Sequence, residues 1–213
     1  MDIDNVAVVI VGVDQWERFT LPLLVSIKGN ERYVPVFCVD NGSKEPYPKW
    51  GGVSIIRSNE IMGYAAGINF GIRFALEQVD AEWFVVLNND VLVKKPFVEN
   101  LLALDPKNLY GFYTWKDLFD WDYLSSWCLF ISKNIWDQIG QFDEAFYPMY
   151  FEDADYSKRV LDAGYDLICL EREEWGFYHL NRWLERKKKL LEYDSGRAAL
   201  RKYLIEKYEG DCA

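Results

Sequence analysis

The sequence predicts an α/β protein with a Rossmann-like, mostly parallel central sheet flanked by helices, and three observations support this. Continuous apolar, largely β-branched runs recur at residues 6–13, at "VPVFCV" and at "EWFVVL", as in strands that are buried on both faces. Segments with helical spacing lie between these runs. Turn-forming polar residues follow several of them, and such alternation is typical of βαβ units, whose ligands bind at the carboxyl ends of the strands.

The first half of the chain continues this alternation. A third strand is expected at residues 53–58, between "VPVFCV" and "EWFVVL". Helices are expected at residues 16–27, 63–79 and 95–104, where Ala, Ile, Phe and Leu recur at helical spacing. Pro96 takes a first-turn position in the last of these, where its missing N–H has no cost.

The second half is crowded with aromatic residues and loses the simple alternation. We expect a strand near Tyr110, an aromatic loop, a strand at residues 127–132 and a short helix. A helix with acids in its first turn then ends at Gly164. A strand at residues 166–171 and a last helix at about 184–208 complete the expected order.

Size and charge limit the possible partners. The 213 residues, half of them apolar, suit a single domain spanning residues 1–213. With 24 Lys and Arg against 34 Asp and Glu, the net charge is −10, which argues against nucleic acid and against anionic membranes. The run "RWLERKKKLL" is a local cationic exception. A phosphate-bearing ligand of so acidic a protein is expected to need a divalent metal cation.

The cysteines and the start of the chain predict the compartment. Cys38, Cys128, Cys169 and Cys212 show no C-x-x-C spacing, and three of them lie in apolar strand-like runs, where a free thiol behaves as a small hydrophobe. The chain starts with acids where a signal peptide needs positive charge, and no apolar run approaches the roughly 20 residues of a spanning helix. We therefore expect a cytoplasmic protein with no integral membrane segment.

Three polar side chains, Asn88, Asn89 and Asp90, follow directly on the apolar run "EWFVVL". A carboxylate flanked by amides at the end of a buried strand is a workable oxygen site for Mg²⁺ or Mn²⁺. The same triplet is also a good surface turn, and taken alone it favours that simpler interpretation.

Glu152, Asp153 and Asp155 begin a predicted helix, where the macrodipole and free N–H groups favour ionised carboxylates. A charged carboxylate can accept the proton of a hydroxyl nucleophile, and Asp153 is the candidate base. The alternative is that these acids only complement the helix end, with Asp155 paired to Arg159 one turn on. That alternative is accepted in part for Asp155, which is otherwise a candidate for acceptor binding.

His179 is the single histidine of the chain. A lone histidine is more often structural, yet imidazole is a natural second ligand for a Mn²⁺ held by Asp90. The glycines at 63, 67 and 71 open a helix without forming the G-x-G-x-x-G phosphate fingerprint, so close packing explains them as well as ligand approach does. Among nine tryptophans, most of them core by default, three are candidates for an acceptor sugar platform: Trp115, Trp121 and Trp127.

Taken in order, the motifs resemble those of the family 2 glycosyltransferases with the GT-A fold, particularly the bacterial-type rhamnosyltransferase branch. The matching stretches cover nearly the whole chain: "VVIVG", "VDNGS", "GYAAGINFGI", "LNNDVLV", "IGQFDEAFYPMYFEDADYSKRVLDAGY", His179 and "YDSGRAALRKYL". The resemblance implies a single GT-A domain with a nucleotide-sugar-binding half at about residues 1–105. An acceptor and catalytic-base half, with a smaller β region, is implied at about 106–213. The compact size and aromatic content also resemble glycosyltransferases of large algal viruses, such as the chlorella viruses.

The family resemblance implies an inverting transfer from a nucleotide-sugar to a hydroxyl of a glycan acceptor. Asp153 matches the catalytic base, with Glu152 beside it. Asp90 ends the D-x-D-like metal motif, and His179 matches a downstream histidine often found at the metal. The implied cofactor is Mn²⁺ or Mg²⁺, which steadies the leaving diphosphate.

Further positions match the donor site of the family. Gly12 and Asp40 match positions that contact the nucleoside, and Arg57, at the end of its strand, could reach the base or ribose. Gly63 and Asn69 match the segment that lines the donor.

The chain departs from the family pattern in two places. Asn88 replaces the first acid of the metal motif, which leaves Asn88 and Asn89 as neutral donor-site residues. An Asn usual two positions before Gly63 is replaced by Ile61, onto which no role is carried, while Asn59 lies two residues further back.

Other functions stay open at this stage. A sugar-1-phosphate nucleotidyltransferase would share the layout, but this chain has "VGVDQWER" where a Gly-rich, basic triphosphate loop is expected. A non-catalytic carbohydrate-binding module would also use aromatic platforms. The donor is expected to be UDP- or dTDP-linked glucose or rhamnose, and the chain could belong to a longer multidomain protein.

Overall fold

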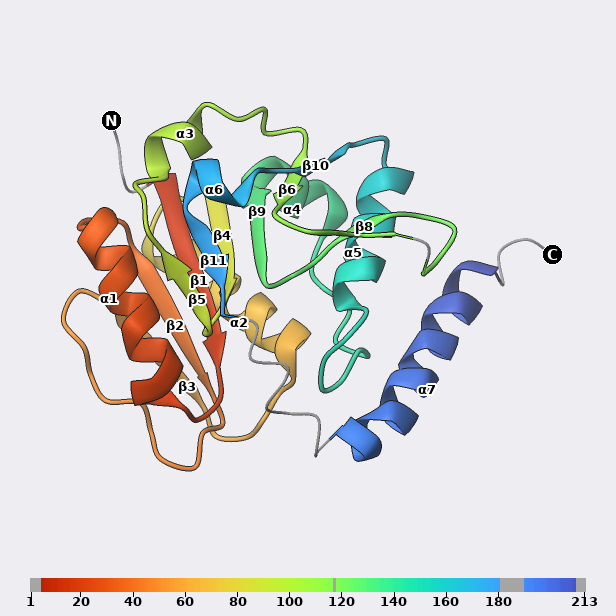
Figure 1. Ribbon diagram of the computed structural model, residues 1–213, viewed down its shortest axis with the longest axis horizontal. Helices are drawn as coiled ribbons and strands as arrows, with labels where there is room; N and C mark the ends of the chain where they lie inside the picture. The colour runs from red at the N-terminus through yellow and green to blue at the C-terminus, as the bar shows by residue number, and fades with distance from the viewer. Residues whose placement is uncertain (1–4, 117, 181–189, 210–213) are drawn as a thin grey trace.

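The computed structural model describes residues 5–116, 118–180 and 190–209. Its centre is a seven-stranded sheet with helices on both faces (Figure 1). The strands of this sheet lie in the order β10 (Leu167–Cys169), β6 (Leu109–Gly111), β9 (Cys128–Ser132), β4 (Trp83–Asn88), β1 (Val6–Gly12), β2 (Val36–Asn41) and β3 (Ser54–Ser58).

The strand directions determine where the polar strand ends gather. β1, β2, β3 and β4 run parallel, and the chain order reverses on either side of β1, which marks the crevice where open α/β sheets bind ligands. β9 is antiparallel to β4, with Leu87 opposite Cys128. The residues that precede β9 therefore lie at the same edge of the sheet as the residues that follow β4.

Helices and one of the two small sheets cover the two faces of the central sheet (Figure 1). On one face, α1 (Leu21–Asn30), α3 (Val98–Leu102) and α6 (Arg172–Trp175) contribute to one apolar core together with the ribbon of β5 (Val91–Val93) and β11 (Phe177–His179). On the other face, α2 (Tyr64–Gln78), α4 (Lys133–Ile139) and α5 (Glu152–Asp162) share a second core.

A π-helical turn, η2 (Trp16–Thr20), lies directly before α1. The other elements lie in the aromatic region at residues 112–136 and beside it. These are a hairpin of β7 (Thr114–Trp115) and β8 (Tyr123–Leu124) and the last helix, α7 (Leu190–Glu209). A third, smaller cluster of apolar side chains joins α7 to this region, with Leu204 fully buried in it.

The strands and helices of the first half confirm the predicted alternation, with differences at the helix ends. The expected helix at residues 16–27 is divided into η2 and α1 and continues to Asn30. Pro96 lies before the helix, because α3 begins only at Val98. The expected start of the last helix at residues 184–189 lies outside the described residues. The β5–β11 ribbon was not predicted, because three-residue strands carry too short a pattern.

Three cysteines lie in the described part, and all three are free thiols. Cys38 and Cys128 are buried as expected, but Cys169 is exposed on the edge strand β10, contrary to the expected small-hydrophobe role. Within the described ranges, none of the helices combines the length and the apolarity that crossing a bilayer requires.

Helix α2 lies against the sheet through two of its glycines. A Cβ added at Gly67 would lie 2.7 Å from Val11 Cγ1, and one at Gly71 would lie 2.5 Å from Val9 Cγ1. Because these contacts are far below van der Waals distance, the close-packing interpretation of these two glycines is confirmed. The helix that leads away from the crevice is thus held directly on β1.

We predict that Gly71→Ala lowers the free energy of unfolding by about 1–3 kcal/mol, because the new methyl overpacks the contact with Val9. Gly29→Ala is the matched control. Gly29 lies within α1 with no atom within 4 Å of an added Cβ, so alanine there is expected to stabilise by about 0.5–1 kcal/mol. Urea denaturation of both variants measures the difference, and equal stability would contradict the packing account.

Candidate functional site

The carboxyl ends of β1 and β4 meet through a packed polar network. A Cβ at Gly12 would lie 2.7 Å from the Tyr47 hydroxyl and 2.9 Å from Asn89 Nδ2. Asn89 Nδ2 donates a hydrogen bond to Thr20 Oγ1 (3.1 Å), and the Tyr47 hydroxyl donates to the carbonyl of Asp14 (2.7 Å). Gly12 is therefore needed so that the groups after β1 and β4 can approach each other.

Asp90 and His179 are brought together by the small ribbon. β11 pairs antiparallel with β5, which places His179 opposite Val91, and Leu180 N–H donates to the Asp90 carbonyl at 2.9 Å. His179 Nε2 then lies 3.1 Å from Asp90 Oδ1, with about a fifth of each side chain exposed (20% and 21%). The two predicted metal ligands, 89 residues apart in the chain, thus form a contact pair.

Trp127 lies beneath this pair. Its ring stacks on the His179 imidazole at a centroid distance of 5.1 Å and an interplanar angle of 3°. Trp127 is buried and also contacts Phe112. Trp127 therefore supports the His179 ring and does not present the exposed platform for an acceptor that was expected from the sequence.

Ser126 connects the predicted base to the same segment. Its N–H donates to Asp153 Oδ2 (3.2 Å), and its hydroxyl donates to Glu152 Oε1 (3.0 Å). Because Ser126 and Trp127 are neighbours in the chain, the Glu152–Asp153 pair lies one residue from the support of His179. Sequence reasoning missed Ser126, since a serine before a strand carries no chemical signal of its own.

Tyr64, at the start of α2, shows the same convergence. Its hydroxyl donates to the carbonyl of Ser126 at 2.9 Å. Burial raises the pKa of Tyr64 well above its ordinary value, and the charges of Glu152, Asp153 and, more weakly, Asp90 raise it further. All three carboxylates therefore lie within electrostatic range of one phenol.

The backbone before α5 turns sharply into the acidic pair. Tyr150 and Phe151 both have positive φ angles, 87° and 70°, a conformation that costs free energy in residues other than glycine. Glu152 is 3% exposed, and its Oε2 atom has no hydrogen-bond partner among the described residues. Glu152 is thus held away from solvent, while Asp153 beside it is only partly buried.

Burial raises the pKa of Glu152, and the neighbouring charge of Asp153 raises it further. Burial also raises the pKa of Asp153, but N–H groups of Ser126 and Ala154 donate to its carboxylate and oppose this effect. We infer that Asp153 is the member of the pair that ionises more readily, as a general base requires.

Asp40 and Arg57 form an ion pair near the carboxyl ends of β2 and β3. Burial alone would raise the pKa of Asp40, but hydrogen bonds from Ser43, Tyr47 and Arg57 outweigh it and hold the pKa below its ordinary value. Asp40 has no exposed surface, and Arg57 Nη1 lies 2.5 Å from its Oδ2. Arg57 is about a third exposed (32%), so Asp40 positions Arg57, which is the member of the pair able to face a ligand.

The other two predicted donor residues have packing contacts. Asn69 is fully buried; its amide donates to the Phe142 carbonyl and to Glu144 Oε1, and it accepts the Phe142 N–H. These bonds attach the segment before α5 to α2 and leave Asn69 no surface for a donor. Gly63 has φ 90°, and a Cβ there would lie 2.9 Å from the Tyr147 ring.

Asp155 is fully buried within an ionic cluster. Its carboxylate accepts bonds from Arg159 Nε (2.9 Å), Lys207 Nζ (2.6 Å) and the Tyr208 hydroxyl (2.8 Å). The predicted pairing with Arg159 is confirmed. Because the Asp155 side chain has no exposed surface, it cannot make the expected contact with an acceptor. It instead links α7 to α5.

Two tryptophans of the aromatic region differ in what they present. Trp115 is 40% exposed, on the β7–β8 hairpin. Trp121 stacks on Phe119 at 4.9 Å, and its Nε1 donates to the Ala154 carbonyl at 3.2 Å. Trp115 therefore keeps exposed surface beside its contact with Tyr123, whereas Trp121 is engaged in packing against α5.

Asp90 and His179 are the two side chains of the site that could hold a divalent cation. No cluster of three or more His, Cys, Asp or Glu side chains suitable for a metal occurs in the part of the chain that the structure describes. Asp90 and His179 supply one oxygen and one nitrogen ligand. Mg²⁺ and Mn²⁺ sites commonly use only one or two carboxylates and complete their coordination with water and substrate phosphates, so this donor set is sufficient.

Three solved structures share the arrangement of strands and helices. GalNAc-T7, crystallised with UDP, GalNAc and Mn²⁺, gives a TM-score of 0.65 at 13% identity over 78% of this chain and 42% of that chain. The mannosyltransferase PcManGT from Pyrobaculum calidifontis, in complex with GDP-Man and Mn²⁺, gives 0.60 at 15% identity over 78% and 55%. S. aureus TarS 1–349 in complex with UDP gives 0.55 at 14% identity over 80% and 62%. The chain has a GT-A fold.

The chain is also similar in sequence to one curated protein. The low-salt glycan biosynthesis hexosyltransferase Agl10 of Haloferax volcanii is 23% identical over 195 residues, which cover 74% of this chain and 62% of the relative. This chain thus spans less than two thirds of that protein's length. No family model matches the sequence.

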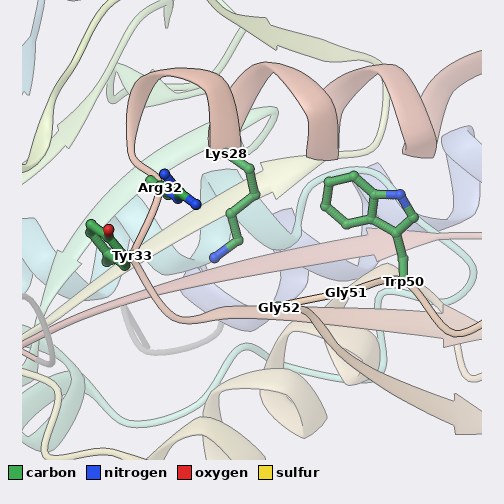
Figure 2. A pocket seen from close by; sticks show the side chains of 6 residues that line it. All are labelled: Lys28, Arg32, Tyr33, Trp50, Gly51 and Gly52. Carbon is green, nitrogen blue, oxygen red and sulfur yellow. The ribbon is translucent and has the colours of Figure 1, made fainter.

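A surface hollow of about 520 Å³ lies at the other edge of the sheet, between the end of α1 and the loop before β3 (Figure 2). It contains none of the predicted site residues. The hollow is lined by Lys28, Arg32, Tyr33, Trp50, Gly51 and Gly52.

We predict that Glu152→Gln raises the free energy of unfolding at neutral pH by about 1 kcal/mol or more, because glutamine is neutral without taking up a proton, whereas the buried Glu152 carboxyl must take up a proton on folding. In the wild type, the raised pKa values mean that the folded state holds protons that the unfolded chain releases. Stability therefore falls as pH rises from the ordinary carboxyl range through the raised values. Urea denaturation from pH 5 to pH 8 should show a weaker pH dependence in the variant.

Glu77→Gln, an exposed substitution on α2, is the control and should reproduce the wild-type pH dependence. A Glu152→Gln protein that is less stable than the wild type across this range would contradict the assigned electrostatics.

Proposed function

We propose that the chain is a nucleotide-sugar-dependent glycosyltransferase that moves a hexose to a hydroxyl group of a glycan acceptor, with inversion at the anomeric carbon. The observation that carries this proposal is the convergence of Asp90 and His179 with Glu152 and Asp153 around the segment of Ser126 and Trp127. The UDP and GDP-Man complexes of proteins with the same fold, and the hexosyltransferase relative, support it.

The donor half would use the carboxyl ends of the strands. Arg57, held by Asp40, is placed to contact the nucleoside. Asn88 ends β4 and Asn89 follows it beside Gly12, and both would donate amide hydrogen bonds without adding negative charge next to a diphosphate. This arrangement suits an anionic donor in an otherwise acidic protein.

Asp153 would act as the general base in this site. Its carboxylate is partly buried and oriented by the N–H groups of Ser126 and Ala154, so it can accept the proton of an acceptor hydroxyl as that oxygen attacks the anomeric carbon. Glu152, anchored by the Ser126 hydroxyl, would keep its neighbour oriented and its surroundings dry.

Asp90 and His179 would hold a divalent cation, Mn²⁺ or Mg²⁺, which when bound neutralises the charge of the leaving diphosphate. Trp127 fixes the plane of the imidazole. The Asp90 carboxylate lies 3.1 Å from His179 Nε2, and the pairing of β5 with β11 holds the two residues together. The two side chains are therefore positioned before any ligand arrives.

The finer assignments rest on the sequence resemblance. We propose UDP or dTDP as the nucleotide, rhamnose or glucose as the sugar and a cytoplasmic site of action. The rhamnosyltransferase branch and the likeness to algal-virus enzymes stay predictions.

We predict that Asp153→Asn lowers the rate of sugar transfer by about 10²–10⁴-fold, while the affinity for the nucleotide-sugar, measured by calorimetry, changes little. The loss follows because asparagine cannot accept the proton. Asp162→Asn, at the other end of α5 and paired only with Lys158, is the control and should transfer at the wild-type rate. If the Asp153→Asn protein kept full transfer and hydrolysis while binding glycans, a carbohydrate-binding module would replace the enzyme.

We also predict that a chelator abolishes donor turnover and that Mn²⁺ restores it. Asp90→Asn and His179→Gln should each raise the Mn²⁺ concentration for half-maximal turnover by about tenfold or more, as followed by nucleotide release. Turnover that persists in chelator at the wild-type rate would contradict the role of both residues. Release of pyrophosphate from a nucleoside triphosphate would instead indicate a nucleotidyltransferase.

A further inference from the structure

A second hollow lies beside the catalytic pair, on the acceptor side of the molecule. Its volume of about 310 Å³ lies at the lower end of the range of small-ligand pockets. One wall comes from α7 and the other from the aromatic region, in which Phe151 is the residue directly before Glu152. The hollow is lined by Leu118, Phe151, Arg197, Ala198 and Arg201.

The two arginines of this hollow contact aromatic rings. The Arg197 guanidinium lies over the rings of Tyr150 and Phe151, 5.2 and 5.6 Å from their centroids. Arg201 lies 5.9 Å from the Phe119 centroid and donates only to the Leu118 carbonyl, at 3.3 Å. Among the described residues neither forms an ion pair, and Arg197 donates no hydrogen bond. When a guanidinium group stacks on a ring, its N–H groups point outward in the plane of the guanidinium and stay available to a ligand.

The position of these arginines is fixed by the other end of α7. Lys207 pairs with Asp143 (2.8 Å) and with the buried Asp155 (2.6 Å), and the Tyr208 hydroxyl donates to Asp155 Oδ1. Leu204, on the same helix, is fully buried in the third apolar cluster. These contacts attach α7 to α5, the helix that carries the base. They therefore hold the wall of the hollow that α7 provides in place.

The hollow and the base share an electrostatic neighbour, Tyr123. Burial raises the pKa of Tyr123, the Asp153 carboxylate raises it further, and the Arg197 guanidinium lowers it. Arg197 and Asp153 therefore both lie within electrostatic range of the same phenol. A ligand held at Arg197 would lie next to the site where Asp153 takes its proton.

We propose that this hollow binds an anionic substituent of the acceptor glycan, a carboxylate or a phosphate, through Arg197 and Arg201. Two guanidinium groups that form no ion pair within the described structure, in a chain of net charge −10, are a specific attraction for an anion, because planar guanidinium donors match the oxygens of both groups. The proposal rests on the proposed function, since it names the acceptor class of that same site. It predicts that an acidic glycan is preferred over its neutral counterpart.

The test compares matched acceptor probes: p-nitrophenyl β-D-glucuronide, p-nitrophenyl β-D-glucoside and glucose 6-phosphate. Binding to the full chain is measured by calorimetry or ligand-observed NMR at low and high salt. We expect the glucuronide or the sugar phosphate to bind about tenfold or more tightly than the neutral glucoside, and whichever anion binds tighter identifies the group. High salt should reduce this preference.

The double variant Arg197→Gln, Arg201→Gln should bind all three probes with equal affinity. The matched control is Lys202→Gln, which removes an exposed charge from the same helix (Lys202 is 75% exposed and pairs with Glu206) and should keep the preference. Thermal unfolding confirms that each variant is folded, and Arg197→Lys, Arg201→Lys should recover part of the preference.

Three outcomes would overturn the proposal. They are a wild type that binds the neutral probe as tightly as the anionic ones, a preference that survives the double Gln variant, and a loss of nucleotide affinity in that variant. The last result would assign the arginines to the donor diphosphate. Absence of donor hydrolysis in the wild type across a panel of nucleotide-sugars would instead overturn the proposed function, and is measured separately.

Discussion

The structure of the candidate site depends on one antiparallel strand. β9 enters the otherwise parallel part of the sheet next to β4 and runs in the opposite direction, so the residues before it lie where the residues after β4 lie. Ser126 and Trp127 are those residues. One holds both carboxylates of the Glu152–Asp153 pair, and the other holds the imidazole that contacts Asp90. If β9 ran parallel, these two groups would lie at opposite edges of the sheet.

The site is organised by fixed polar contacts at a cost in stability. Glu152 is buried beside another carboxylate with one oxygen unbonded within the described structure, and the two residues before it adopt strained backbone angles. Such strain is typical of functional positions. The surrounding core and α7 compensate for this loss of stability. Lys207 of α7 pairs with the buried Asp155, which lies on α5 together with the proposed base.

Much of the fold could be predicted from the sequence, because buried parallel strands carry long apolar runs and the helices between them carry clear spacing. Metal-ligand chemistry and the family resemblance both suggested that Asp90 and His179 act together, and the geometry brings the two side chains into contact. Asn69, Asp155 and Trp127 were expected at ligands, yet they have packing roles, since a buried amide, acid or indole gives the same sequence signal in either role. Ser126 and the β5–β11 ribbon could not be found, because their importance lies in tertiary register and not in local pattern.

The most direct measurement of the central claim is a crystal structure with Mn²⁺ and a nucleotide diphosphate, in which anomalous scattering locates the cation. The account predicts Mn²⁺ on Asp90 and His179, with the diphosphate at the carboxyl ends of β1 and β4 and Asp153 facing the open side of the same crevice. A cation and nucleotide bound elsewhere, for example in the hollow beside Trp50, would contradict it.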